Sequence, residues 1–256
     1  MPLSPGRSIR VVRHAVFHDG VDDYVLVPIV LYGWREVTIE DLLYLYHPKL
    51  GLGSGFTSVF GAPAGGDGPS TYIQAYDFPA YRNLFVRMLV LKPDGSGRYY
   101  DANLYPYRNM WVQVVRRFTS DREYSVYVNA ARAVSYTIPV EEQTFLERNP
   151  EEALRPWAYQ RFVLGAHFDT TNPMKVSYYT FRVYSRVLDD WEIEHNFRYP
   201  YDPVRRDLEV YLLAHPDYIR DIDGDGVLEW IDLSGKGRHA KLYGARLVEL
   251  VKPPAR

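Results

Sequence analysis

Short stretches in which apolar and polar residues alternate recur along most of the chain. A period of two places successive side chains on opposite faces of a β-strand. Turn-forming clusters, such as Pro93–Gly97 and residues 119–122, separate these stretches at intervals of about 8 to 12 residues, which is typical of a β-sandwich or barrel. The pattern therefore predicts an all-β fold, with strands at residues 71–76, 84–91, 110–118, 124–129, 162–165 and 176–184.

Three further segments have less regular patterns. Residues 9–31 alternate around an Asp-Gly pair, which indicates a β-hairpin. Residues 37–46 fit either a short capped helix or a strand, because they are rich in β-branched and aromatic residues. The glycine-rich residues 51–70 indicate a long loop, and long loops on rigid sandwiches often carry binding residues.

Two segments depart from the strand pattern altogether. Residues 141–156 are polar and indicate a surface insertion with one or two turns of helix. Residues 189–198 predict a short helix, because Asp189 and Glu192 stand at the spacing of a capping box.

The composition bounds the fold and excludes several functions. With 256 residues the chain can bury a full core as a single domain. The net charge of −2 and the scattered basic residues give no electrostatic reason to expect a nucleic-acid partner. No apolar run approaches the roughly 18 residues of a membrane span, and the N-terminal residues lack the apolar core of a signal peptide. The absence of cysteine excludes disulfides, cysteine nucleophiles and thiolate metal sites.

Three blocks of the sequence resemble one known superfamily. They read AVFHDGVDDYVLVP at residues 15–28, WVQVVRRFTSDREYSVYVN at residues 111–129, and FVLGAHFDTTNPMKVSYYTFRVYSRVLDDWEIEHNF at residues 162–197. In order and spacing they resemble the opening hairpin, the central hairpin and the closing strand and helix of concanavalin A-like lectins and glucanases, most closely the laminin-G-like and pentraxin-like branch. The resemblance implies a two-sheet antiparallel jelly roll. Ala130 stands where that family prefers glycine, so we expect the turn there to differ.

Catalytic motifs are missing from the sequence. The superfamily contains hydrolases, lectins, adhesion modules and structural domains, so the fold alone assigns no activity. A retaining glucanase needs two carboxylates about 5 Å apart, and the Glu-x-Asp-x-x-Glu pattern of the relevant branch does not occur. The glutamates of residues 141–152 lie in the polar insertion and predict a solvated surface. No Gly-x-Ser-x-Gly motif or helical histidine pair is present. We therefore predict that the protein is not an enzyme.

Tyrosines are the candidate ligand-binding residues. The chain contains 23 tyrosines, and its 24 arginines far outnumber its six lysines. Tyrosine and arginine suit stacking and bidentate contacts. Tyr99, Tyr100, Tyr105 and Tyr107 alternate with polar residues, and their rings can stack on the C–H faces of sugars. Packing in the core or against another protein is the alternative interpretation.

An acidic segment near the C-terminus is a candidate calcium site. Asp221, Asp223 and Asp225 precede Gly226, as in the first half of an EF-hand loop, where alternating carboxylates bind Ca²⁺. Asp232 stands at the twelfth position, where an EF-hand has glutamate, and no long helix follows. A solvated acidic turn without a cofactor is therefore the alternative.

Residues 208–250 resemble the first strands of laminin-G-like domains, although they follow the closing helix. The sequence permits a circular permutation, because the termini of a sandwich often lie close together. It also permits exchange with another copy of the chain, giving a homo-oligomer or a head-to-tail assembly. A truncated second repeat is the third alternative.

These observations predict a non-catalytic, lectin-like surface or adhesion protein. Its expected partner is a cell-surface glycan or glycoprotein, and its expected location is extracellular, on a cell surface or on a virion. The alternative function is a structural assembly subunit, such as a virion or filament protein, that uses the sandwich for self-association.

Overall fold

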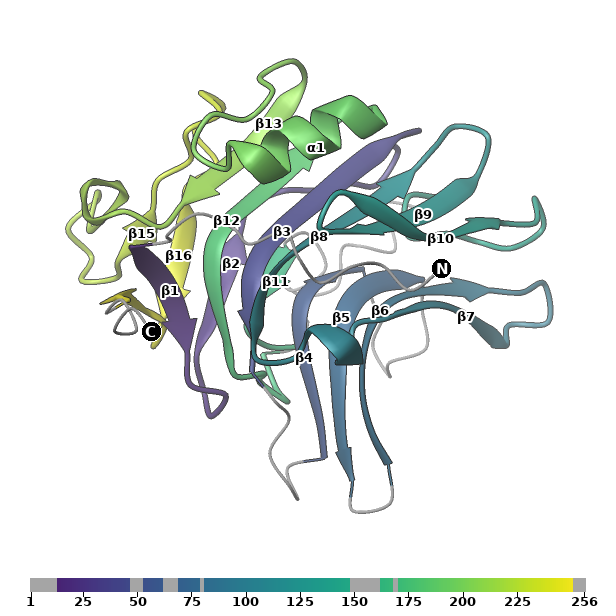
Figure 1. Cartoon of the computed structure of the whole chain (residues 1–256), viewed down its shortest axis with the longest axis horizontal. Coiled ribbons are helices and arrows are strands. Elements are labelled where there is room, and N and C mark those ends of the chain that lie inside the picture. The colour runs from purple at the N-terminus through teal and green to yellow at the C-terminus, as the bar shows by residue number, and fades with distance from the viewer. Residues whose placement is uncertain are drawn as a thin grey trace, which may run out of the picture.

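The computed structural model describes residues 13–46, 53–61, 69–78, 81–147, 162–167 and 170–250. The predicted all-β sandwich is confirmed: two antiparallel sheets contain every described strand (Figure 1). One helix, α1 (Asp190–Arg198), is the only described α-helix. Among the described residues, no helix has the length and apolar character to cross a membrane.

The first sheet, called sheet A, has the order β10-β9-β8-β3-β12-β1-β17, and β13 also pairs with β12. Because β3 occupies one whole edge of β12, β1 and β13 pair with successive parts of its other edge. The strands of sheet A are β1 (His14–His18), β3 (Val37–Leu45), β8 (Met110–Phe118), β9 (Glu123–Val128), β10 (Ala131–Thr137), β12 (Val176–Tyr184), β13 (Leu208–Leu213) and β17 (Arg246–Glu249).

The second sheet, called sheet B, has the order β14-β15-β16-β2-β11-β4-β5-β6-β7. Two described 3₁₀ helices lie in connections between sheet B and sheet A. They are η1 (Tyr105–Tyr107), between β7 and β8, and η4 (Pro216–Tyr218), between β13 and β14. The strands of sheet B are β2 (Tyr24–Val27), β4 (Gly53–Phe60), β5 (Ser70–Phe78), β6 (Tyr81–Leu91), β7 (Gly97–Asn103), β11 (Phe162–Leu164), β14 (Ile219–Arg220), β15 (Glu229–Trp230) and β16 (Ala240–Tyr243).

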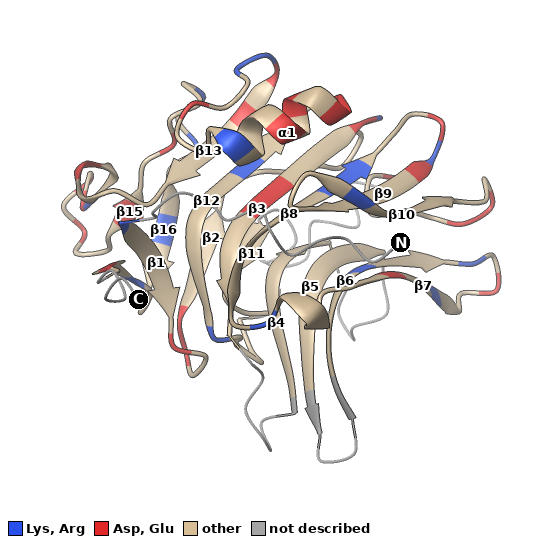
Figure 2. Cartoon of the chain, in the orientation of Figure 1, with Lys and Arg blue, Asp and Glu red and all other residues tan. Residues whose placement is uncertain are grey.

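Alternating side chains build one core between the sheets. On β3, Ile39, Leu43 and Leu45 face inward and are fully buried, as are Val112 and Val114 on the neighbouring strand β8. Burying such side chains stabilises the fold by about 1.5–3 kcal/mol each. Among the described residues, acidic and basic side chains are interspersed over the strands and loops in the view of Figure 2.

A buried ion pair within sheet A is part of a hydrogen-bond network that reaches sheet B. Arg116 on β8 donates from Nη2 to Oδ2 of Asp41 on β3 at 2.8 Å, and both side chains are fully buried. Arg116 also donates to the backbone oxygen of Ser58 on β4 at 2.8 Å, and the Ser58 hydroxyl donates to Asp41 at 2.6 Å. Because β4 belongs to sheet B, this network connects the two sheets. Burial raises the pKa of the Asp41 carboxyl, while Arg116 opposes that rise.

The short helix is confirmed where the capping box predicted it. The Asp189 side chain accepts from the backbone N–H of Glu192, and the Glu192 carboxylate accepts from the Asp189 N–H at 2.9 Å. The helix lies over one end of sheet A (Figure 1). Its Asn196 donates to Glu40 of β3 at 2.9 Å, and Arg117 of β8 donates to the backbone oxygen of Leu188, just before the helix, at 3.1 Å.

The prediction of a β-hairpin at residues 9–31 is wrong. Strands β1 and β2 exist but do not pair, because β1 belongs to sheet A and β2 to sheet B. The turn between them, residues 19–23, carries the chain from one sheet to the other. Alternation shows which residues are extended, but both sheets bury one face, so it does not show which neighbours a strand selects.

Two other predictions are corrected. Residues 53–60 form strand β4 and not a loop, because Phe56, Val59 and Phe60 give it apolar positions on both faces. Residues 141–147, the described part of the predicted surface insertion, contain no helix. There Phe145 is fully buried in the core, and Glu142 is buried beside Tyr100 and Arg98. Of residues 37–46, which fitted two alternatives, residues 37–45 form strand β3.

Residues 208–250 pair with strands of the same chain. β13 pairs with β12 and β17 with β1 in sheet A, while β16 pairs with β2 in sheet B. Trp230 of β15 is fully buried in the common core. The segment therefore completes both sheets in cis, and exchange with another copy stays a prediction.

Candidate functional site

A hollow that is open to solvent lies at one end of sheet A. It has a volume of about 490 Å³ and is lined by Trp34, Arg35, Glu36, Ser120 and Ser185. These residues come from three segments that are distant in the sequence. We call this feature the Trp34 hollow.

Strand pairing explains why these segments meet. The antiparallel register places Val37, at the start of β3, opposite Phe118, at the end of β8. It also places Thr38 opposite Tyr184, at the end of β12. The residues just before β3 therefore lie beside the residues that follow β8 and β12. Ser120 belongs to the β8–β9 turn, and Ser185 directly follows β12.

A tight turn before β3 presents the indole. Gly33 has a φ of +82°, which favours glycine, and its N–H donates to the backbone oxygen of Leu146 at 2.8 Å. The N–H of Trp34 donates to the backbone oxygen of Leu31 at 3.2 Å. Trp34 is half-buried, with part of the ring packed against the core and the rest open to the hollow. A ring fixed in this way offers an apolar surface at little entropic cost.

Polar groups of different types surround the indole. Glu36 accepts a hydrogen bond from the Ser120 hydroxyl at 2.9 Å, which leaves further lone pairs on its carboxylate. The Ser185 hydroxyl donates to Glu209 at 3.2 Å. The Arg35 guanidinium is exposed and makes no hydrogen bond or ion pair with the described part of the chain. The hollow therefore combines a stacking surface with hydrogen-bond donors and acceptors.

The tyrosines predicted to bind glycans do not form one surface. Tyr99 on β7 points outward and is 55% exposed, with the Arg87 guanidinium 4.2 Å from its ring. Tyr100 points inward, is buried, and donates to Glu142 at 2.8 Å. Tyr105 and Tyr107 lie in η1 and pack against the core. These four residues are therefore split between two faces and a connecting turn, and only Tyr99 is exposed.

The predicted calcium ligands are also separated. Asp221, Asp223 and Asp225 lie together with carboxylate oxygens within 4.8 Å of one another. Asp232 is buried elsewhere and accepts from the Tyr211 N–H at 2.9 Å and the Ser234 hydroxyl at 2.7 Å.

Lys241 already contacts the acidic loop. Its ammonium lies 2.7 Å from Asp225 and 3.2 Å from Asp223, and it lowers the pKa of Asp225. Calcium would have to compete with Lys241 for these carboxylates. Calcium binding stays a prediction, and only three of the four expected ligands are close enough to share an ion.

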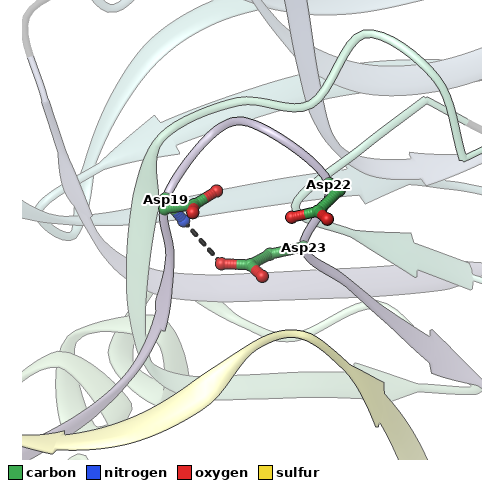
Figure 3. Close-up of side chains that lie close together, drawn as sticks. All are labelled: Asp19, Asp22 and Asp23. Atoms are coloured by element: carbon green, nitrogen blue, oxygen red, sulfur yellow. Dashed lines mark hydrogen bonds between the residues drawn. The ribbon is translucent and has the colours of Figure 1, made fainter.

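The structure contains a second acidic cluster, whose residues the sequence pattern indicated only as part of a turn. Asp19, Asp22 and Asp23 in the β1–β2 turn also bring carboxylate oxygens within 4.8 Å of one another (Figure 3). Asp23 is buried and accepts from the Asp19 N–H at 2.7 Å. Burial and the two neighbouring carboxylates raise the pKa of Asp23. Three hard oxygen ligands suit a divalent cation, although exposed acidic turns also occur without one.

Comparison with solved structures identifies proteins of similar fold. A protein of Bacteroides ovatus for which carbohydrate binding has been proposed has a TM-score of 0.63 and 15% sequence identity, over 95% of this chain and 62% of that chain. A mutant of HCR/D has a TM-score of 0.50 and 12% identity, over 76% of this chain and 45% of that chain. The receptor binding domain of botulinum neurotoxin D has a TM-score of 0.49 and 11% identity, over 76% and 46%.

The chain spans less than two thirds of the length of each of these structures. At such identities the likeness to the first two shows a shared fold. Neither a protein-family model nor a curated protein sequence matches the chain.

Proposed function

We propose that the protein binds carbohydrate in the Trp34 hollow. The observation that carries this proposal is the half-buried indole of Trp34 beside the carboxylate of Glu36 and the guanidinium of Arg35, which has no partner among the described residues. A sugar presents an apolar C–H face that packs on an aromatic ring. Its hydroxyls both donate and accept, so they require partners of both kinds. Glu36 accepts, Arg35 donates, and the serine hydroxyls do either.

The lining residues and the open shape of the hollow favour binding over hydrolysis. Glycoside hydrolysis uses two carboxyl groups on opposite sides of the scissile bond. Among the described lining residues, Glu36 is the only carboxylate. The hollow is open to solvent, which suits recognition of the end or the side of a glycan chain.

The similar fold of the Bacteroides ovatus protein supports this proposal but does not establish it, because a fold hosts many functions. Membership of the concanavalin A-like superfamily and a location outside the cell stay predictions. Both are compatible with a β-sandwich that binds glycans.

Replacing Trp34 tests the proposal. Trp34→Ala removes the stacking surface, so we expect affinity for the best-bound oligosaccharide to fall roughly tenfold, which is about 1.4 kcal/mol. Isothermal titration calorimetry against a panel of neutral and acidic oligosaccharides measures the change. Arg35→Ala should weaken binding less, because one exposed hydrogen-bonding group is lost.

Trp191→Ala is the matched control. Trp191 lies on α1, is 63% exposed, and does not line the hollow. The control should bind like the unchanged protein. Equal affinity of Trp34→Ala and Trp191→Ala for every bound sugar would contradict the proposal.

A further inference from the structure

We propose a second binding surface, a row of aromatic side chains across sheet A that binds an extended neutral polysaccharide chain. The row consists of Phe17, Tyr46, Tyr44 and Trp111, and we call it the aromatic row. It goes beyond the Trp34 hollow, because it involves other residues at the opposite end of the same strands.

The strand register builds the row. Phe17 of β1 lies opposite Ser177 of β12, Ser177 opposite Tyr44 of β3, and Tyr44 opposite Trp111 of β8. Residues directly opposite in antiparallel strands share one face of a sheet. Tyr46, just beyond β3, places its hydroxyl 3.2 Å from that of Ser177 and so fills the position between Phe17 and Tyr44.

The row lies on the outer face of sheet A. The strand neighbours Val16, Leu43, Leu45 and Val112 are fully buried in the core, and side chains alternate between faces. All four aromatic residues are instead partly exposed. Outward aromatic side chains in a continuous series are uncommon unless they contact a partner.

The spacing suits a chain of sugar units. Successive ring centroids are 6.1 Å apart from Phe17 to Tyr46, 4.7 Å from Tyr46 to Tyr44, and 5.7 Å from Tyr44 to Trp111. Phe17, Tyr44 and Trp111 lie on three different strands, and Tyr46 follows the strand of Tyr44, so the steps stay near the strand spacing of about 4.8 Å. Units of an extended polysaccharide advance by a similar distance, and each unit can contact one ring.

The ring orientations select the form of the polysaccharide. The same three pairs are inclined by 80°, 60° and 71°. Rings at such angles do not make one flat platform, which packing on a crystalline surface would require. They suit a single, twisted polysaccharide chain that contacts the face of one aromatic ring and the edge of the next.

The charges beside the row favour a neutral ligand. The Lys175 ammonium lies 4.9 Å from the ring centroid of Tyr46, and the Arg246 guanidinium lies 5.8 Å from that of Phe17. The acidic turn of residues 19–23 (Figure 3) borders the same end, because a Cβ on Gly20 would meet the Lys175 backbone at 2.8 Å and Asp23 interacts electrostatically with Arg246. The two cations and the exposed carboxylates of Asp19 and Asp22 can bind hydroxyls, whereas the carboxylates of the turn would repel an acidic polymer or an anionic membrane.

The two surfaces are separate. Glu36 of the hollow and Tyr44 of the row are eight residues apart along one extended segment, which corresponds to roughly 26 Å at about 3.3 Å per residue. Helix α1 lies over the hollow end of the same sheet face (Figure 1). One oligosaccharide of two or three units therefore cannot reach both surfaces.

Chain length distinguishes the row from the hollow. The probes are soluble neutral polysaccharides (hydroxyethylcellulose, xyloglucan, galactomannan and mixed-linkage β-glucan) in affinity gel electrophoresis. Dextran sulfate and vesicles of phosphatidylserine with phosphatidylcholine serve as anionic probes. Neutral oligosaccharides of two to six units are titrated by calorimetry. The proteins are the unchanged chain, Trp111→Ala, Tyr46→Ala, Trp34→Ala and Trp191→Ala, each checked by its melting temperature.

We expect at least one neutral polysaccharide to retard the unchanged chain, and Trp111→Ala to weaken that retardation at least tenfold. Affinity should rise with oligosaccharide length. Tyr46→Ala should repeat the loss, and it carries the test if Trp111→Ala does not fold. Row-dependent polymer binding with no Trp34-dependent binding of short sugars would leave this inference standing and refute the proposed function of the hollow.

Equal retardation of Trp111→Ala, Tyr46→Ala and the unchanged chain would overturn the inference. Binding to dextran sulfate or anionic vesicles without binding to any neutral polysaccharide would overturn it as well, in favour of an anionic partner.

Discussion

At the residue scale, Ala130 has an unfavourable backbone conformation and His18 has an unfavourable environment. Asn129 and Ala130 form the β9–β10 turn with φ values of 51° and 63°. Asparagine tolerates this left-handed region, but the Cβ of alanine is unfavourable there. His18 at the end of β1 is fully buried, and neither ring nitrogen has a hydrogen-bond partner among the described residues.

Ala130→Gly should stabilise the protein. Glycine adopts a positive φ without steric cost, so we expect the free energy of unfolding to rise by about 1 kcal/mol. Urea denaturation measures the change. Asn129→Ala should do the opposite, because it places a second alanine in the left-handed region. A destabilised Ala130→Gly variant would show that Ala130 contributes packing that outweighs the strain.

His18 should make stability depend on pH. Burial lowers its pKa from 6.5 to about 4, so between these values the unfolded chain binds a proton that the folded chain does not. Stability is therefore fully present above pH 6.5 and is lost as the pH falls toward 4. The loss is about 3 kcal/mol, from about 1.36 kcal/mol per pKa unit. His18→Leu should remove this contribution to the slope in urea denaturation at pH 4 to 7. An unchanged slope would assign the acid sensitivity to other groups.

At the element scale, alternation predicts most strands but not their partners. The strands expected at residues 110–118 and 124–129 are found at residues 110–118 and 123–128, and they pair as β8 and β9. β1 and β2 have the same kind of pattern, yet they join different sheets. β1 pairs with β12 and β17, whereas β2 pairs with β11 and β16, and all four partner strands are far away in the sequence.

Arg116→Met should destabilise the sandwich strongly. It leaves the Asp41 carboxylate buried without its cation, and breaking such a pair costs about 3–5 kcal/mol. Adding Asp41→Leu should recover much of this loss, because the buried charge is removed. Chemical denaturation of the two variants measures the difference. A loss below about 1 kcal/mol in Arg116→Met would contradict this expectation and would mean that Asp41 takes up a proton or that water reaches the site.

At the scale of the whole molecule, the C-terminal strands close both sheets, and the two ends of the described chain meet. The N–H of Leu250 donates to the backbone oxygen of Arg13 at 2.8 Å, where β17 pairs with β1. The sequence predicts that residues 208–250 are an edge of the sandwich. It could not show whether they pair in cis, because identical strand edges exist on every copy of the chain.

A circular permutant tests this closure. The permutant joins Arg256 to Met1 and opens the chain between Arg205 and Arg206, in the exposed segment before β13. Every strand pair is kept, so we expect a single melting transition within a few degrees of that of the unchanged chain by circular dichroism. A permutant that folds only as a dimer would indicate that residues 208–250 exchange between copies.

The candidate site shows where prediction from the sequence ends. The four tyrosines were selected by local alternation, which places Tyr99 and Tyr100 on opposite faces. The Trp34 hollow forms from residues 34–36, Ser120 and Ser185, which become neighbours only through the β3–β8 and β3–β12 register. The sequence offered one local signal for this site, which is Trp34 between Gly33 and the charged pair Arg35 and Glu36. Its partners depended on long-range pairing.

The most direct test of carbohydrate binding in the hollow is an NMR titration of the indole N–H groups of the five tryptophans. A short neutral oligosaccharide that binds the protein is added stepwise, and Trp34→Ala assigns one resonance. Carbohydrate binding in the hollow predicts that the Trp34 resonance shifts and that the resonance of the control, Trp191, stays in place. Binding that leaves the Trp34 resonance unmoved would contradict it.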